Sequence, residues 1–166
     1  MSEKIKTRKV KTNTLYFFAT LLVITLLSCN RGEMFYRFHH FPHGNWRTNE
    51  TVVFTMDSLD FQTDRKYQVF IELSANGTFP YRYLQLLVEH NLTDSVFNTD
   101  TLQLALIDEF GRRLGGGVGG LRQLSAPLFT SLTLDTAQVY EIRIEHGMRH
   151  SRLRGIERMG VMVVAQ

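Results

Sequence analysis

The chain has 166 residues, a net charge of +3 and a single cysteine. The first 28 residues hold five basic residues and one acid, a net of +4, so the remaining 138 residues carry a net charge of −1. A domain with this balance does not indicate a nucleic-acid-binding protein, which needs a clustered basic patch. One cysteine excludes a disulfide within the chain, and 138 residues suffice for one domain with its own core.

The first element that the sequence predicts is an export signal. Basic residues precede an apolar run from Leu15 to Leu27, which ends in Ser28-Cys29. A basic segment, a short apolar segment and a small residue at the cleavage point are typical of a signal peptide. The run is shorter than the roughly 20 apolar residues of a transmembrane helix. We therefore predict that residues 1–28 are a signal peptide cleaved between Ser28 and Cys29. The alternatives are an uncleaved signal anchor and a plain signal peptide with a coincidental cysteine.

The residues around the cleavage point, Leu26-Leu27-Ser28-Cys29, resemble the lipobox of bacterial lipoproteins. In those proteins the cysteine thiol receives a diacylglycerol, and the new amino terminus is often acylated as well. The resemblance implies that Cys29 is lipidated, since two or more acyl chains hold a protein stably on a membrane. Residues 29–33 are then a short tether, and the covalent lipid on Cys29 is the one attached group that we expect. An acylated Cys29 leaves no thiol for catalysis or for a metal.

Residues 34–50 combine aromatic residues with three histidines. This composition differs from that of a Gly/Ser-rich flexible linker. We predict a first strand and then an irregular segment that packs on the domain. His39, His40 and His43 lie close together, but no carboxylate stands at ligand spacing and Pro42 leaves their directions undefined, so we predict no metal site.

The pattern of residues 34–166 predicts a single all-β domain. Alternating or β-branched segments lie at 51–56, 67–73, 81–90, 101–107, 128–134, 139–146 and 159–164. With the first strand they make about eight strands separated by turns, which predicts an antiparallel, jelly-roll-like β-sandwich. A single helical turn is expected within residues 147–156. Segments 51–56 and 159–164 carry no charge, so each is expected to be an interior strand or a docking edge.

The segment 111–120, GRRLGGGVGG, is the candidate partner-binding loop, and six of its ten residues are glycine. This density implies positive φ angles, close backbone approach or mobility. No Lys-Ser/Thr pair follows into a helix, so the segment does not predict a phosphate-binding P-loop. Arginines at its start can pair with an acidic partner or be solvated. The candidate residues are Arg112, Arg113, Gly115, Gly117 and Gly119.

The chain shows none of the sequence patterns of a hydrolase, and we predict no catalytic residues. Glu141 and Glu145 share one face of their predicted strand and flank Arg143. Charges at this spacing predict a ladder of salt bridges across neighbouring strands rather than a catalytic pair.

Several further motifs stand in the order typical of one known family. After the lipobox come Phe41-Pro42, Trp46 and then the segments 80–84, 100–102, 106–108, 111–115, 140–142, 146–149 and 153–156. Together they resemble the gliding motility lipoprotein GldH family of the Bacteroidetes. The resemblance implies a non-enzymatic lipoprotein of the cell envelope that takes part in gliding motility and its linked secretion machinery. Its expected role is that of an assembly or stabilising partner.

The same resemblance implies two partners: the membrane, through the lipid anchor, and other envelope proteins of the gliding and secretion apparatus. Nucleic acid is not among the expected partners. Only Glu33 is acidic close to Cys29, so we expect a protein of the outer membrane that faces the periplasm. A membrane-tethered, carbohydrate-binding sandwich is the alternative, and it requires Trp46 and its neighbours to form an exposed, coplanar platform.

Overall fold

The computed structural model describes residues 33–57, 61–135 and 138–166. These ranges hold ten strands, one 3-10 turn at Pro42–Gly44 and no α-helix. The strands are β1 (Glu33–His40), β2 (Asn45–Arg47), β3 (Val52–Met56), β4 (Lys66–Ala75), β5 (Tyr83–His90), β6 (Asn98–Ala105), β7 (Arg122–Thr133), β8 (Tyr140–His146), β9 (Arg152–Arg154) and β10 (Ile156–Ala165).

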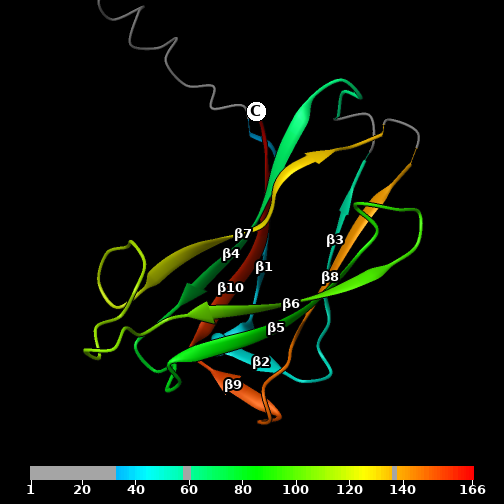
Figure 1. Cartoon of the computed structure of the whole chain (residues 1–166). Coiled ribbons are helices and arrows are strands. Elements are labelled where there is room, and N and C mark those ends of the chain that lie inside the picture. Colours follow the sequence, from blue (N-terminus) through cyan, green and yellow to red (C-terminus); the bar gives the residue numbers. More distant parts are fainter. Residues whose placement is uncertain (1–32, 58–60, 136–137) are drawn as a thin grey trace, which may run out of the picture. The chain divides into compact units, whose positions relative to one another are not determined.

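Eight of these strands form two antiparallel four-stranded sheets, and β2 and β9 form a small third sheet. The large sheets have the strand orders β1-β10-β4-β7 and β3-β8-β5-β6 (Figure 1). If the eight long strands are renumbered from 1 to 8 in chain order, leaving out β2 and β9, the two large sheets have the orders 1-8-3-6 and 2-7-4-5. This is the order of a jelly roll built from two Greek keys. The predicted all-β, jelly-roll-like sandwich is therefore confirmed.

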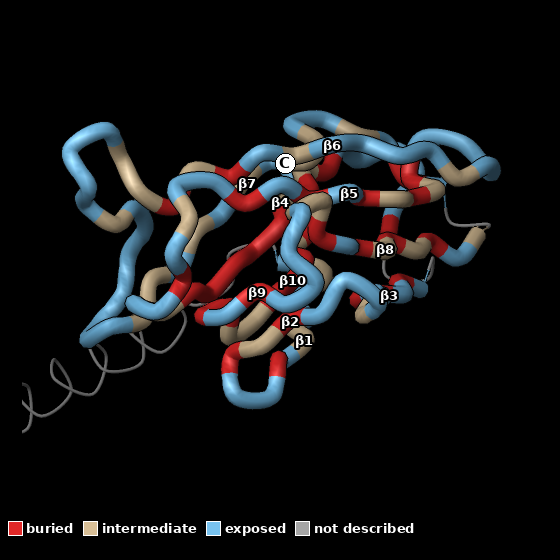
Figure 2. Tube along the Cα trace, turned by 90° about the horizontal axis from the view of Figure 1, so that it is seen from below, coloured by how far each residue is buried: buried red, intermediate tan, exposed pale blue. Residues whose placement is uncertain are grey.

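The core lies between the inner faces of the two large sheets. Tyr67, Val69, Ile71 and Leu73 of β4 alternate along the strand, and all four are fully buried. Figure 2 shows buried residues in red along β4, β10 and β8, while the loops are mostly exposed. A fully buried aliphatic or aromatic side chain contributes roughly 1.5–3 kcal/mol. Because apolar side chains recur at every second position, burying them determines which face of each strand points into the core.

The expected helical turn within residues 147–156 is wrong. This segment instead contains β9, which pairs with β2 in the register Asn45↔Arg154, Trp46↔Leu153 and Arg47↔Arg152. Trp46 and Leu153 are both fully buried, so a hydrophobic pair holds the small sheet against the core. Gly155 follows with a φ of 84°, which a glycine adopts readily and a helix excludes.

The two uncharged strands occupy different places. β10 lies between β1 and β4, so the segment 159–164 is interior. β3 is the edge of its sheet, and among the described strands β8 is its one hydrogen-bonded neighbour. Of the two segments, only 51–56 can therefore offer a free sheet edge.

The predicted signal peptide and the predicted lipidation site at Cys29 lie outside the described residues. Within the described ranges, the structure contains no helix of the length and apolarity needed to span a membrane.

Candidate partner-binding surfaces

The glycine-rich segment begins with a tight turn that Asp108 organises. Its carboxylate accepts hydrogen bonds from the main-chain N–H groups of Phe110 (2.9 Å) and Arg112 (2.8 Å). It also pairs with the guanidinium of Arg112 at 2.7 Å. Across the base of the turn, the N–H of Leu114 donates to the carbonyl of Leu106 at 2.9 Å. Arg112 is thus paired within the chain, although its side chain is 75% exposed.

The same contacts set the charge of Asp108. Burial raises the pKa of the Asp108 carboxyl, but the hydrogen bonds from Arg112 and Phe110 outweigh this, and the pKa lies below its ordinary value. A lowered carboxyl pKa favours folding above the unfolded-state pKa, and this contribution is lost as the pH falls through the folded-state pKa. The turn is therefore fully stabilised at neutral pH.

Arg113 holds the loop against the turn at residues 76–79, which lies elsewhere in the chain. Its guanidinium donates to the carbonyl oxygens of Gly77 at 2.6 Å and Phe79 at 3.3 Å. These residues lie between β4 and β5, which belong to different sheets, just as the loop itself connects β6 to β7. Arg113 therefore joins two sheet-to-sheet crossings, and its guanidinium is occupied by main-chain carbonyls rather than free for an acidic partner.

A second turn follows, closed by two hydrogen bonds between Gly116 and Gln123, of 2.7 and 3.0 Å. Gly115, Gly117 and Gly119 have φ angles of 93°, 149° and 67°. A Cβ added at Gly115 would clash with the carbonyl oxygen of Gln123, and one at Gly117 with that of Leu121. Positive φ and close backbone approach thus explain the glycines at 115 and 117.

The residues that the loop presents outward are apolar. Phe110 is 74% exposed and Val118 is 93% exposed, each near the tip of one of the two turns. Leu114 is partly exposed as well. Sequence reasoning concentrated on the arginines and missed these side chains. The available signal was an aromatic and a branched apolar residue placed among glycines.

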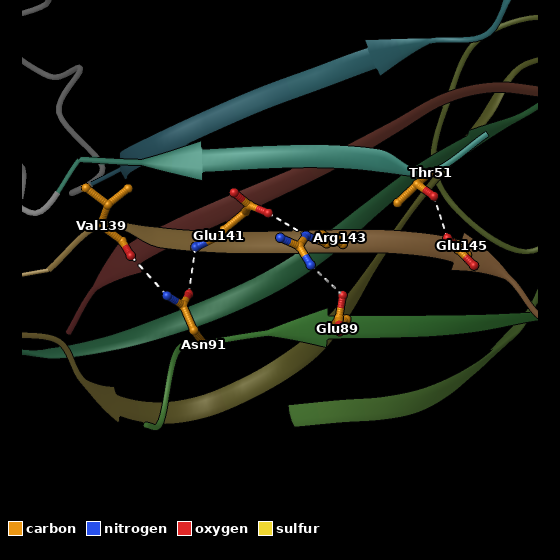
Figure 3. A network of polar contacts seen from close by, with 7 residues as sticks. All are labelled: Thr51, Glu89, Asn91, Val139, Glu141, Arg143 and Glu145. Atoms are coloured by element: carbon orange, nitrogen blue, oxygen red, sulfur yellow. Dashed lines mark hydrogen bonds and ion pairs between the residues drawn. The ribbon is translucent and has the colours of Figure 1, made fainter. Parts of the chain in front are cut away.

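The exposed edge of β3 has a defined hydrogen-bonding pattern. The N–H of Glu141 in β8 donates to the side-chain oxygen of Asn91 at 2.7 Å, on the side of the sheet away from β3 (Figure 3). The C=O of Glu141 accepts the main-chain N–H of Asn91 at 3.4 Å. Thr55 lies opposite Glu141 and Val53 opposite Arg143, so both belong to the pairs that are not hydrogen-bonded. Their N–H and C=O groups point outward, and the Val53 side chain is 50% exposed.

The charged face of β8 is largely satisfied. Arg143 pairs with Glu141 on its own strand and with Glu89 on β5 at 3.0 Å (Figure 3). These hydrogen bonds raise the pKa of Arg143 further, so it stays charged. Glu145 accepts a hydrogen bond from the Thr51 hydroxyl. The predicted ladder therefore includes Glu141 and the cross-strand Glu89, with Glu145 bonded to a hydroxyl group.

The aromatic residues of segment 34–50 do not form an exposed, coplanar platform. Trp46 is fully buried and stacks on the buried Phe41, with ring centroids 4.9 Å apart. Its indole N–H donates to the carbonyl of Glu50 at 2.8 Å. The feature required for carbohydrate binding is therefore not present at Trp46.

The three histidines of this segment have separate surroundings. His39 packs edge-on against Phe41 and lies 3.4 Å from Glu50. His40 is exposed, and His43 lies in the turn at Pro42–Gly44. Across the described ranges, no group of three potential metal ligands is present.

His146 is a buried histidine without a hydrogen-bond partner. It is 3% exposed, neither ring nitrogen has a partner, and the ring meets Trp46 edge-on at 5.1 Å. Burial lowers its pKa, with a small opposing effect from Glu145. Between the lowered folded-state pKa and the unfolded-state pKa of about 6.5, the unfolded chain therefore binds more protons at His146 than the folded chain does. Stability falls as the pH drops from 7 towards the lowered folded-state pKa.

We expect His146→Phe to raise the melting temperature at pH 7 and to flatten its decline between pH 7 and 5, because an unsatisfied buried polar group costs about 1–3 kcal/mol. His90 is the matched control. It is 1% exposed, but it pairs with Asp100 at 3.1 Å and accepts the N–H of Leu92 at 3.3 Å. His90→Phe should therefore destabilise the domain. A lower melting temperature for His146→Phe at both pH values would contradict this account.

The chain is similar to known proteins over nearly all of the described domain. A family model described as GldH lipoprotein matches residues 33–163. The "Gliding motility lipoprotein GldH" of Flavobacterium johnsoniae is 24% identical over 138 residues, covering 82% of this chain and 84% of that protein. The crystal structure of the infectious bursal disease virus VP2 subviral particle matches 78% of this chain and 32% of the viral chain, with 14% identity. Its TM-score of 0.33 is too low to support any conclusion.

Proposed function

The chain belongs to the GldH lipoprotein family, and from this membership we propose that it acts in gliding motility and the linked protein secretion machinery as an assembly or stabilising partner. Membership supports a lipid-anchored place in the cell envelope. The proposed activity is the docking of another envelope protein, and it requires no catalytic residue.

The observation that carries the docking proposal is the free edge of β3. Val53 and Thr55 direct unpaired main-chain groups away from β8, and no residue of β3 carries a charge that would discourage pairing. Such an edge accepts an extended segment of a partner by strand addition, in which main-chain hydrogen bonds provide the affinity. We propose an extended segment of an envelope protein as its occupant.

The loop at 108–120 is the second proposed contact. Internal hydrogen bonds of Asp108 and Arg113 hold it, and it exposes Phe110 and Val118. Apolar side chains on a preorganised loop bind a partner with little loss of conformational entropy. In this proposal Arg112, Arg113, Gly115, Gly117 and Gly119 position the loop, and the apolar tips make the contact.

The test is the capture of envelope proteins by the lipidated protein after detergent solubilisation. We expect one defined partner to co-purify with the wild-type protein in stoichiometric amount, and variants of the β3 edge or the loop tips to lose it while remaining folded. Co-purification that survives both sets of variants would contradict docking at these surfaces.

The proposed location is the periplasmic face of the outer membrane, anchored through Cys29. We expect Cys29→Ser to move the protein from the membrane fraction to the soluble envelope fraction, or to leave it uncleaved, because no acyl chain can then be attached. Fractionation and the mass of the mature chain provide the measurement. Retention of a correctly cut Ser variant in the membrane would refute lipidation. Digestion of the wild-type protein by protease added to intact cells would refute the periplasmic orientation.

A further inference from the structure

A hollow of about 670 Å³ opens beside the small β2–β9 sheet. Its volume lies within the roughly 300–1,000 Å³ of small-molecule sites. Six of its seven lining residues are polar or charged, and two arginines against one glutamate give them a net charge of +1, although the domain as a whole has no excess of positive charge. The polar lining residues are His43, Asn45, Arg47, Asn49, Glu50 and Arg152.

Two arginines of the lining lie directly opposite each other. Arg47 pairs in register with Arg152. Main-chain hydrogen bonds join Gly155 N–H to Gly44 C=O (2.8 Å) and Thr48 N–H to Ser151 C=O (3.0 Å). Hydrogen-bonded pairs alternate along an antiparallel ladder, so the Arg47–Arg152 pair between them has no main-chain hydrogen bonds. In such pairs the Cα atoms are only about 4.5 Å apart. Like charges in this position are destabilising, and neither arginine forms an ion pair with a described residue.

The arginines stand on a fixed backbone. The turn after Arg47 is closed by the hydrogen bond from Glu50 N–H to Arg47 C=O at 3.0 Å and by the bond from Trp46 to Glu50 C=O. On the other side, His43 has a φ of 59° and is the one non-glycine residue of the described part with a positive φ. The Asn45 amide donates to its carbonyl at 3.0 Å. Strained residues held in this way cluster at binding sites.

We propose that this hollow binds a phosphate ester, with Arg47 and Arg152 as the principal ligands of the phosphate. A phosphate monoester carries between −1.5 and −2 charges and three acceptor oxygens. Two guanidinium groups match that charge and bind such oxygens in a bidentate manner. The amides of Asn45 and Asn49 supply further donors, and the volume leaves room for the organic part of the ester.

Glu50 is the one acid of the lining, and it opposes the binding of an anion. Its carboxylate lies 3.4 Å from the His39 ring nitrogen and accepts the Arg47 N–H at 3.4 Å. The site should therefore bind an anion more tightly when this charge is removed.

A phosphate ester can be soluble or can be the headgroup of a lipid. The hollow lies past the His40 end of β1, while the predicted tether joins at Glu33. An eight-residue strand spans about 26 Å. This separation favours a soluble ester over a headgroup of the anchoring membrane.

The test is calorimetric titration of the full lipidated protein in detergent with glycerol 3-phosphate. A second arm uses nanodiscs of phosphatidylcholine with and without phosphatidic acid. We expect saturable binding of glycerol 3-phosphate, an affinity at least tenfold lower in Arg152→Gln or Arg47→Gln, and a higher affinity in Glu50→Gln. Fluorescence of Trp46, the single tryptophan of the chain, gives a second readout beside the site.

Arg65→Gln is the matched control, because Arg65 is exposed and lies just before β4, whose beginning pairs with the far end of β10. Its affinity should equal that of the wild-type protein. If Arg152→Gln melts early, Arg152→Lys replaces it, since lysine keeps the charge and loses the planar fork. If the protein binds only nanodiscs with phosphatidic acid and this binding depends on Arg152, the site is supported and its phosphate ester is a lipid headgroup. No saturable binding in either arm, or an equal loss in Arg65→Gln, would overturn the proposal.

Discussion

Proline at Val53 should leave the domain folded and abolish co-purification of its partner. The Val53 N–H points away from β8, so the proline removes no hydrogen bond of the sheet, and edge strands tolerate proline. The same proline removes one of the donors that an added strand needs. We expect the melting temperature to change by only a few degrees and the captured partner to be lost.

Two further prolines provide the contrast. Phe54 is 6% exposed and belongs to a hydrogen-bonded pair with Ile142, so Phe54→Pro should unfold the domain, at a cost of about 3 kcal/mol or more. Val163→Pro should do the same, because β10 has a neighbour on each side. Val53→Thr keeps the N–H and should retain the partner. Capture that persists in a folded Val53→Pro protein would exclude strand addition at β3.

The second large effect is expected at Gly115. Valine there must adopt a φ of 93° and meet the carbonyl of Gln123, with the Leu124 side chain 3.0 Å from its Cβ. Strain of this kind costs of order 1–3 kcal/mol, so Gly115→Val should lower the melting temperature by several degrees. Gly116→Val is the matched control, since no atom lies within 4 Å of a Cβ at this neighbouring position and its φ is not positive. An unchanged melting temperature for Gly115→Val would show that the loop is a mobile tip.

The contact made by the loop is tested separately from its order. Phe110→Ser and Val118→Ser remove exposed apolar surface and no internal hydrogen bond. Phe110→Ser also removes the contact of the Arg112 guanidinium with the Phe110 ring, 5.3 Å from the ring centroid, which contributes about 0.5–1 kcal/mol at an exposed site. The melting temperature should therefore fall by a few degrees at most. If these side chains form part of the contact, each substitution should weaken capture by about tenfold, the loss typical of an interface residue that contributes more than 1 kcal/mol.

The fold could be predicted from the sequence because its long strands alternate cleanly. Tyr67, Val69, Ile71 and Leu73 mark the inner face of β4 in the sequence itself, and the same holds for β8. The small β2–β9 sheet could not be predicted, because each strand has three residues and one buried side chain. Its existence depends on Trp46 meeting Leu153, a contact between residues about a hundred positions apart that no local pattern reports.

The candidate surfaces were predictable only in part. The glycines of segment 111–120 mark a loop that needs unusual φ angles, and the uncharged β3 marks a possible edge. Arg113 donates to main-chain carbonyls of a turn that is distant in the sequence. Every residue has a main-chain carbonyl, so the residue types there do not reveal this contact. The opposition of Arg47 and Arg152 likewise exists only once the register of the small sheet is known.

The central place of β10 also governs when this protein can fold. β10 follows every other described strand in chain order, yet it lies between β1 and β4. Neither neighbour can complete its sheet until residues 156–165 have been synthesised, and long-range pairing of this kind is slow. The nascent chain therefore lacks a folded sandwich while it is being made. This delay suits the export signal predicted at residues 1–28, because the chain would stay unfolded and able to cross a membrane until residues 156–165 have been made.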